Sequence, residues 1–211
     1  MESLAGAAGL TIALAVVGGY LLGSIPFGLI AARLGGAGDI RQIGSGNIGA
    51  TNVLRTGRRD LAAFTLIGDM GKGALAILIA RWLVPAAPDI GAVAGGAAFL
   101  GHLFPVWLKF RGGKGVATFF GVLLAAAWPV GLLSGLTWIV IAVIARYSSL
   151  AALTAAGLAP VFALYTHKSW TVFWLTVFMA ALIFLRHRAN MGRLITGAEP
   201  RIGEKKDEPA A

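Results

Sequence analysis

The sequence predicts an all-α integral membrane protein with seven transmembrane helices, its N-terminus outside the cell and its C-terminus in the cytoplasm. The first observation is composition: 57% of the 211 residues are hydrophobic and 13% are charged. A soluble domain carries roughly 25% charged residues, so much of this surface must face lipid. The second observation is a series of long apolar runs, and the third is the distribution of basic residues between them.

The apolar runs predict the helices. The first extends from Leu4 to Leu34, and we expect a helix over about 8–32 of it, which is long enough to cross a bilayer. The other predicted helices occupy Leu61–Val84, Ile90–Leu108, Val116–Ala127, Val130–Ala145, Leu150–Tyr165 and Trp170–Leu185. The pair on either side of Trp128 and Pro129 is short, and one bent helix, giving six spans, is the alternative. Strands are disfavoured because the runs lack alternation with a period of two.

The basic residues set the predicted orientation. With seven spans, fifteen of the 18 Lys and Arg residues lie on one side, two (Arg81 and Lys168) lie on the other, and Lys72 falls within a helix. The side rich in positive charge is the cytoplasmic one. The net charge of +9 is therefore explained by topology and anionic headgroups, and we expect no nucleic-acid partner. We expect residues 1–203 to form one domain and 204–211 to form a disordered polar tail.

A first polar segment, Gly44–Arg55, lies on the predicted cytoplasmic side. Gly44, Gly46 and Gly49 match the G-x-G-x-x-G pattern, but no strand precedes them, so a dinucleotide-binding unit is disfavoured. Glycine allows close backbone approach, and a loop of this kind that leads into a helix can hold a phosphate. Its polar and cationic side chains are Ser45, Asn47, Thr51, Asn52 and Arg55. A turn rich in Gly and Asn, without a ligand, is an equally good interpretation of this segment alone.

A second segment, Arg111–Gly115, places Lys114 among Gly112, Gly113 and Gly115 immediately before a helix. The spacing of a Walker ATP-binding loop is absent, because a glycine follows the lysine. A lysine beside free backbone amides still suits a phosphate. Anchoring by the positive-inside rule is the alternative, but anchoring does not need the glycines.

A third segment, Arg186–Glu199, extends the last helix into the cytoplasm. His187 and Asn190 are three residues apart and share a helix face, and Arg193 follows three residues later. A basic helix end that reaches the headgroups is the alternative. Within the second predicted helix, Asp69 and Lys72 form an i, i+3 pair to which we assign a structural role.

The remaining inventory excludes several chemistries. The chain has no Cys, and His102, His167 and His187 show no metal-ligand spacing, so we expect neither a metal nor a cofactor. No Ser-His-Asp set is recognisable, and the His-x-x-x-x-Asp signature of membrane acyltransferases is absent, because Trp107 stands five residues after His102. The residues therefore favour binding of anionic substrates that carry their own activation over supply of a nucleophile.

Together the three segments resemble the three motifs of the bacterial membrane acyl-phosphate:glycerol-3-phosphate acyltransferases, the PlsY family. The resemblance runs from the first helix to about Gly203. It implies a seven-helix enzyme of the bacterial inner membrane whose site faces the cytoplasm. It implies transfer of a fatty acyl group from acyl phosphate to the first-carbon hydroxyl of glycerol 3-phosphate, as a step of phospholipid biosynthesis. The products are 1-acyl-glycerol 3-phosphate and phosphate.

The resemblance also implies roles for particular residues. The catalytic set that lines the phosphate site is Ser45, Arg55, Lys114, His187 and Asn190. Further substrate-binding residues are Gly46, Asn47, Thr51, Asn52, Gly112, Gly113, Gly115 and Arg193. The expected partners are glycerol 3-phosphate, fatty acyl phosphate and membrane lipid, and docking of a soluble enzyme that produces acyl phosphate stays open. A transporter of an anionic metabolite and a lipid-binding scaffold are the rival functions.

Overall fold

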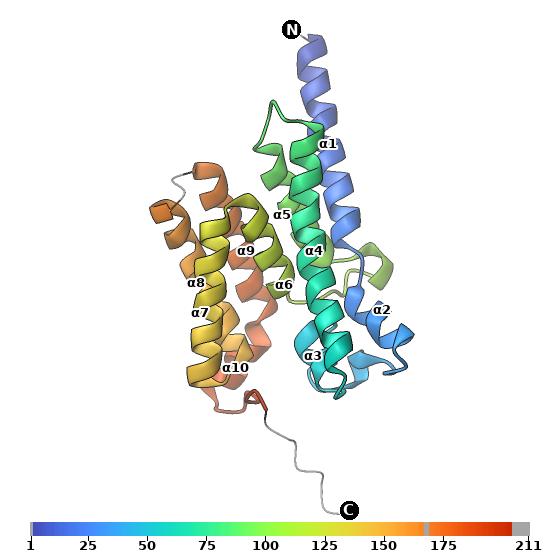
Figure 1. Ribbon diagram of the computed structural model, residues 1–211, viewed down its shortest axis with the longest axis vertical. Helices are drawn as coiled ribbons and strands as arrows, with labels where there is room; N and C mark the ends of the chain where they lie inside the picture. The colour runs from blue at the N-terminus through green and yellow to red at the C-terminus, as the bar shows by residue number, and fades with distance from the viewer. Residues whose placement is uncertain (1, 167–168, 204–211) are drawn as a thin grey trace, which may run out of the picture.

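The computed structural model describes residues 2–166 and 169–203, and these residues form a helical bundle without strands (Figure 1). The predicted tail and the break at His167 and Lys168 lie outside the described residues. The longer helices are α1 (Glu2–Gly23), α4 (Arg59–Leu83), α5 (Ile90–Leu103), α6 (Val116–Ala126), α7 (Trp128–Ala145), α8 (Ser148–Thr166) and α9 (Trp170–Arg186). The short helices are α2 (Phe27–Leu34), η1 (Ile40–Gln42), α3 (Ala50–Leu54), η2 (Val106–Leu108) and α10 (Arg188–Ile195).

The all-α prediction is confirmed, and five segments are long and apolar enough to cross a membrane. They are Ala8–Leu34, Arg59–Leu83, Ile90–Leu108, Trp128–Ala145 and Ser148–Thr166. A sixth results if α9 and α10, which meet at a bend of 62°, are counted together. Because α6 has only 11 residues, about half the length that a spanning helix needs, the count of seven spans stays a prediction.

The first predicted helix is broken. Helix α1 ends at Gly23, and α2 begins at Phe27 after Pro26, which cannot donate a backbone hydrogen bond. The break frees the carbonyl of Ile25, which accepts a hydrogen bond of 2.9 Å from Nζ of Lys72 on α4. A predicted single helix over 8–32 is therefore wrong in detail, because the proline divides it into two.

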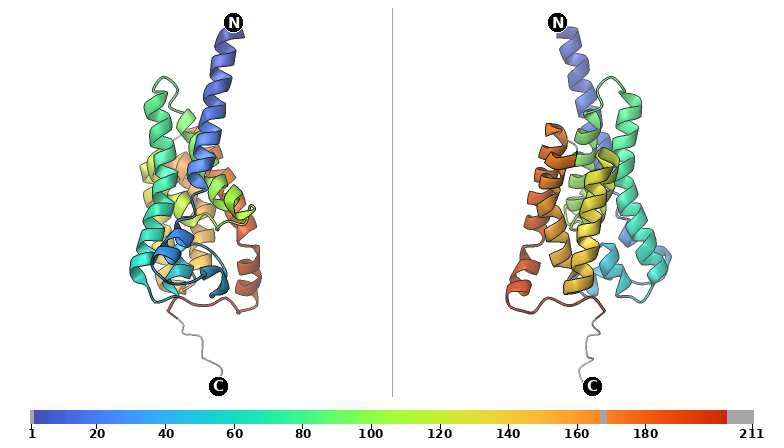
Figure 2. Two further views of the ribbon diagram at one scale, coloured as in Figure 1. Left: turned by 90° about the vertical axis from the view of Figure 1, so that its right-hand side faces the viewer. Right: turned by 60° about the vertical axis from the view of Figure 1, so that its left-hand side comes forward.

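The alternative of one bent helix over 116–145 is also wrong. The chain leaves the helical conformation at Ala127, with φ −156° and ψ 87°, and α7 turns back along α6 (Figure 2). The side chain of Arg81, at the end of α4, donates to the carbonyls of Ala125 (2.7 Å) and Ala126 (3.2 Å). These hydrogen bonds satisfy carbonyls that the last turn of α6 leaves unpaired, so α6 can end inside the bundle.

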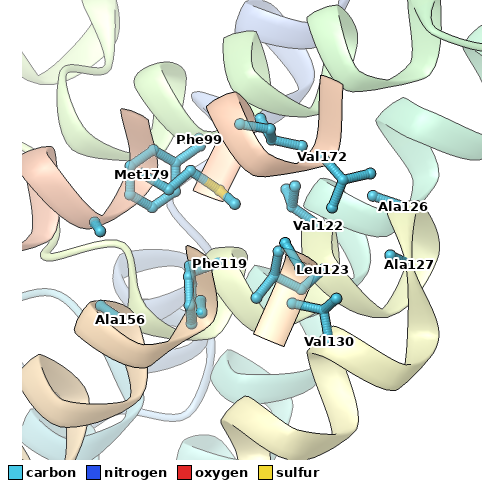
Figure 3. Close-up of a cluster of buried hydrophobic side chains, with 14 of the residues drawn as sticks. Phe99, Phe119, Val122, Leu123, Ala126, Ala127, Val130, Ala156, Val172 and Met179 are labelled. Carbon is cyan, nitrogen blue, oxygen red and sulfur yellow. The ribbon is translucent and has the colours of Figure 1, made fainter. Parts of the chain in front are cut away.

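Short α6 lies between the two groups of long helices. It packs against α4 and α5 on one side and against α7 and α9 on the other. Figure 3 shows its Phe119, Val122 and Leu123 meeting Phe99 of α5 and Met179 of α9 in the main hydrophobic core. The arrangement fixes the N-terminus of α6, and with it the preceding glycine–lysine loop, relative to both groups.

Helices α1 and α5 approach so closely that only small residues fit between them. A Cβ atom added at Gly19 or Gly23 would overlap the backbone of Ala94 or Ala98, respectively. Small residues four apart are a common basis of helix pairing in membranes, where dispersion contacts replace the hydrophobic effect. This contact holds the C-terminal end of α5 in place beside α1.

We expect Gly23→Ala to destabilise the protein by about 1–3 kcal/mol, the usual cost of overpacking a tight contact. The new methyl group would collide with Ala98, and thermal unfolding in detergent measures the loss. Gly18→Ala is the matched control, because a Cβ atom there meets nothing within 4 Å. Equal melting temperatures for the two variants would contradict the proposed packing.

Candidate functional site

Helices α2, α3 and α10 lie at the same end of the bundle, opposite the N-terminus of α1 (Figures 1 and 2). This end carries the first and the third polar segments of the sequence. The second segment reaches the third through the hydrogen bond from Lys114 to Asn190.

The first segment is folded around the buried side chain of Asn52. Its Nδ2 donates to the carbonyl of Ile40 at 2.7 Å. Its Oδ1 accepts from the amide and hydroxyl of Ser45, at 3.2 and 3.4 Å, and from Arg55 at 3.5 Å. The hydrogen bonds of Asn52 therefore fix the conformation of the loop and the positions of Ser45 and Arg55, which are both exposed.

Two of the three glycines of this segment need the conformational freedom of glycine. Gly44 and Gly46 have φ values of +56° and +66°, which other residues rarely adopt, whereas Gly49 has a φ of −87°. A Cβ atom at Gly44 would also lie 2.6 Å from the Arg55 guanidinium. Asn47 is half-buried in the loop, and Thr51 is exposed in the first turn of α3.

The second segment is held by its own backbone and by Arg186. The amides of Gly112 and Gly113 donate to the carbonyls of Leu103 and His102, each at 3.1 Å. Arg186 donates to the carbonyls of Gly112 (2.8 Å) and Gly113 (3.1 Å). These two amides are therefore engaged within the protein and are not available to a phosphate, in contrast to the expectation from sequence.

Gly115 differs from its neighbours because it begins α6. Its φ is +88°, and a Cβ atom there would lie 2.5 Å from the ring of Phe99. Glycine is therefore required both by conformation and by space. The turn directs the N-terminus of α6, with its unpaired amides, toward the end that carries the polar segments.

Lys114 joins the second segment to the third. Its Nζ donates to Oδ1 of Asn190 at 2.6 Å, across 76 residues of sequence. Asn190 in turn donates to Glu199 at 2.6 Å, and Glu199 also accepts from Arg193 at 2.7 Å. Asn190 and Glu199 are buried, so this chain of hydrogen bonds fixes the Lys114 amine.

The charge of Arg55, in the first segment, acts on the Lys114 amine. Burial lowers the pKa of Lys114 from 10.5 to about 8. Glu199 opposes this effect, and the charges of Arg193, Arg55 and Arg186 reinforce it. Arg55 of the first segment therefore acts on the same amine as Arg193 of the third, which gathers four cationic side chains around one region.

His187 lies in the bend between α9 and α10, beyond the last apolar helix. Its Nδ1 lies 2.8 Å from the carbonyl of Ile183 and must donate the hydrogen, because a carbonyl only accepts. Burial first, and then the charges of Lys114 and Arg186, lower its pKa to about 4. The imidazole is therefore neutral near pH 7, with the lone pair on Nε2.

Two residues of this site were absent from the predicted set. Arg186 clamps the glycine loop, and Glu199 links Asn190 to Arg193. Burial raises the pKa of Glu199, but the hydrogen bonds from Asn190 and Arg193 and the charge of Arg193 help to lower it below its ordinary value. The signal for Glu199 was present in the sequence, since it is the one acid within the basic stretch from Arg186 to Arg201.

Among the described residues, no group of three or more His, Cys, Asp and Glu side chains could hold a metal ion. The site instead combines ammonium and guanidinium groups with neutral amides and a neutral imidazole. Such a set can bind phosphate groups and stabilise negative charge that develops on oxygen.

Comparisons with known proteins agree with this chemistry. The family model described as glycerol-3-phosphate acyltransferase matches residues 13–197. A glycerol-3-phosphate acyltransferase of Caulobacter vibrioides is 68% identical over 98% of this chain and 94% of its own length. One from Dinoroseobacter shibae is 55% identical over 98% of this chain and all of its own length.

Two solved structures are also similar. The glycerol 3-phosphate form of PlsY (YgiH), an integral membrane glycerol 3-phosphate acyltransferase, has a TM-score of 0.85 and 41% identity, covering 91% of this chain and 96% of its own. The lysophosphatidic acid form has a TM-score of 0.82 and 38% identity over 91% and 95% of the two chains. This multi-pass membrane protein therefore belongs to the PlsY family of glycerol-3-phosphate acyltransferases.

Proposed function

We propose that this protein transfers a fatty acyl group from acyl phosphate to the first-carbon hydroxyl of glycerol 3-phosphate. The single observation that supports this most is the hydrogen bond between Lys114 and Asn190, because it joins two separate motifs around one buried amine. The glycerol 3-phosphate and lysophosphatidic acid forms of the similar PlsY structures agree with this acceptor and this type of product. The choice of acyl phosphate as donor rests on the resemblance of the three motifs.

The cations divide between two phosphorylated substrates. Lys114 stands directly before the N-terminus of α6, where helix amides and the helix dipole favour an anion. Arg55 is exposed above the same region and offers a planar, bidentate donor set. Ser45, His187 and Asn190 complete the proposed catalytic set, and Arg193 holds Glu199 behind Asn190.

The proposed reaction is a direct attack. The hydroxyl oxygen of glycerol 3-phosphate bonds to the carbonyl carbon of acyl phosphate, and the bond from that carbon to the phosphate oxygen breaks. Phosphate leaves with the electron pair, and no acyl-enzyme forms. The hydroxyl proton passes to a phosphate oxygen of a substrate, with Nε2 of His187 as the protein alternative. The cations stabilise the developing negative charge.

The proposed placement is the bacterial inner membrane, with seven spans and the site facing the cytoplasm. The first and third polar segments and the C-terminal end of the described chain lie at one end of the bundle, and the N-terminus of α1 lies at the other (Figure 1). The excess of Lys and Arg in the loops predicted on the side of the C-terminus supports a cytoplasmic orientation for that end. The acyl chain then extends between helices at membrane depth.

The donor is tested by turnover. Purified protein in detergent, mixed with acyl phosphate and glycerol 3-phosphate, should release inorganic phosphate and form 1-acyl-glycerol 3-phosphate. Acyl-CoA in place of acyl phosphate should give no product. Absence of turnover, together with uptake of glycerol 3-phosphate into vesicles that contain the protein, would instead support the transporter function.

The pKa of Lys114 predicts a pH dependence of substrate binding. The amine is protonated below pH 8 and neutral above it, so its attraction for a phosphate falls as the pH rises through 8. We expect the KM for glycerol 3-phosphate to rise on the order of tenfold between pH 7 and 9.5. Lys114→Arg should remove this rise, because a guanidinium stays charged. A KM that rises equally in both proteins would show that another group titrates.

The proton acceptor is tested with His187→Gln, which keeps a hydrogen-bonding side chain but removes the imidazole. If a substrate phosphate accepts the proton, we expect kcat to stay within about threefold of the unmodified protein, since only a weak positioning effect is lost. Steady-state kinetics measures this. Loss of about a hundredfold or more in turnover, with the variant still folded, would assign the proton to His187.

A further inference from the structure

A buried charged cluster lies beneath the glycine–lysine loop and has no role in the proposed reaction. It consists of Asp69 and Lys72 on α4 and His102 on α5, and their side chains are only 2–4% exposed. Lys72 Nζ lies 2.8 Å from Asp69 Oδ1, which lies 3.5 Å from His102 Nδ1. Ionisable groups at this depth of a membrane protein are costly, and apolar side chains could join the two helices at lower cost.

The cluster makes contact with the site through His102. The His102 ring packs directly against Gly113, where a Cβ atom would overlap Nε2 and lie 2.9 Å from Cε1. The carbonyl of His102 also accepts the hydrogen bond of the Gly113 amide at 3.1 Å. One residue therefore contacts Gly113 with both its side chain and its backbone, immediately before Lys114.

The orientation of the ring follows from its neighbours. Nδ1 lies 3.5 Å from Oδ1 of Asp69 without forming a hydrogen bond to it, and the negative charge of the carboxylate favours the tautomer that carries its hydrogen on Nδ1. Lys72 holds that carboxylate in place and is itself bound to the carbonyl of Ile25 at the α1–α2 break. Arg186 donates to the carbonyls of Gly112 and Gly113. The loop is thus held both by His102 and by Arg186.

We propose that His102, oriented by Asp69, is a positioning residue that sets the place of the Gly113 backbone and, through it, of the Lys114 amine. This inference rests on the proposed role of Lys114 in binding phosphate. His102 acts indirectly. Its ring does not contact a substrate, but a shift of the ring would move the loop that carries Lys114. A displacement of about 1 Å at a catalytic group can lower the rate on the order of a hundredfold.

The test compares three substitutions of His102. An Asn amide reaches the place of Nδ1 and keeps an N–H group facing Asp69, a Gln amide reaches the place of Nε2, and Phe fills the volume without a donor. We expect His102→Gln and His102→Phe to lower kcat/KM for glycerol 3-phosphate by about ten- to a hundredfold, and His102→Asn to keep it within about threefold. Ser134→Ala is the control, because Ser134 is fully buried on α7, outside the cluster.

A second readout does not depend on turnover. Glycerol 3-phosphate should raise the melting temperature of the unmodified protein and of His102→Asn, and should raise that of His102→Gln and His102→Phe much less. Wild-type kcat/KM in the Gln and Phe variants would overturn the inference. Equal losses in the Asn and Gln variants would also overturn it, since the donor to Asp69 would then be irrelevant. A protein that binds glycerol 3-phosphate without any acyl transfer would overturn the proposed function alone.

Discussion

The hydrogen bond from Lys114 to Asn190 is the interaction on which the site depends. It joins residues that are 76 positions apart in the sequence and connects α10 to the loop directly before α6. Asn190 is oriented to accept it because its amide nitrogen donates to Glu199, and Glu199 is held in turn by the guanidinium of Arg193. Each member is held by the next, so the amine of Lys114 has a defined place before any substrate arrives.

Close backbone approach is what allows polar loops to sit at the end of an apolar bundle. Gly19 and Gly23 bring α1 against α5, and Gly115 lets α6 begin directly over the ring of Phe99. In a membrane, the hydrophobic effect contributes little to the association of helices. The helices associate through close van der Waals contact instead, which small residues permit. The glycines of these contacts therefore position α5 beside α1 and the start of α6 over Phe99.

Buried charges in this protein are satisfied in pairs rather than avoided. Arg81 closes the C-terminal end of α6, and Lys72 joins Asp69 to the break after α1. Both cations compensate for backbone carbonyls that the helix geometry leaves unpaired, which is the strongest constraint on a chain surrounded by lipid. Short α6 and broken α1 are possible because of these two side chains.

The sequence alone determined the class of the fold and the chemistry of the site. Composition and apolar runs predicted an all-helical membrane protein, and glycines beside cations predicted phosphate-binding loops, because both depend on local residue type. The tertiary structure decided which groups meet. It showed that the amides of Gly112 and Gly113 bind the end of α5, that Arg186 and Glu199 support the site, and that Pro26 divides the first helix. These contacts join residues far apart in the chain, so spacing along the sequence could not reveal them.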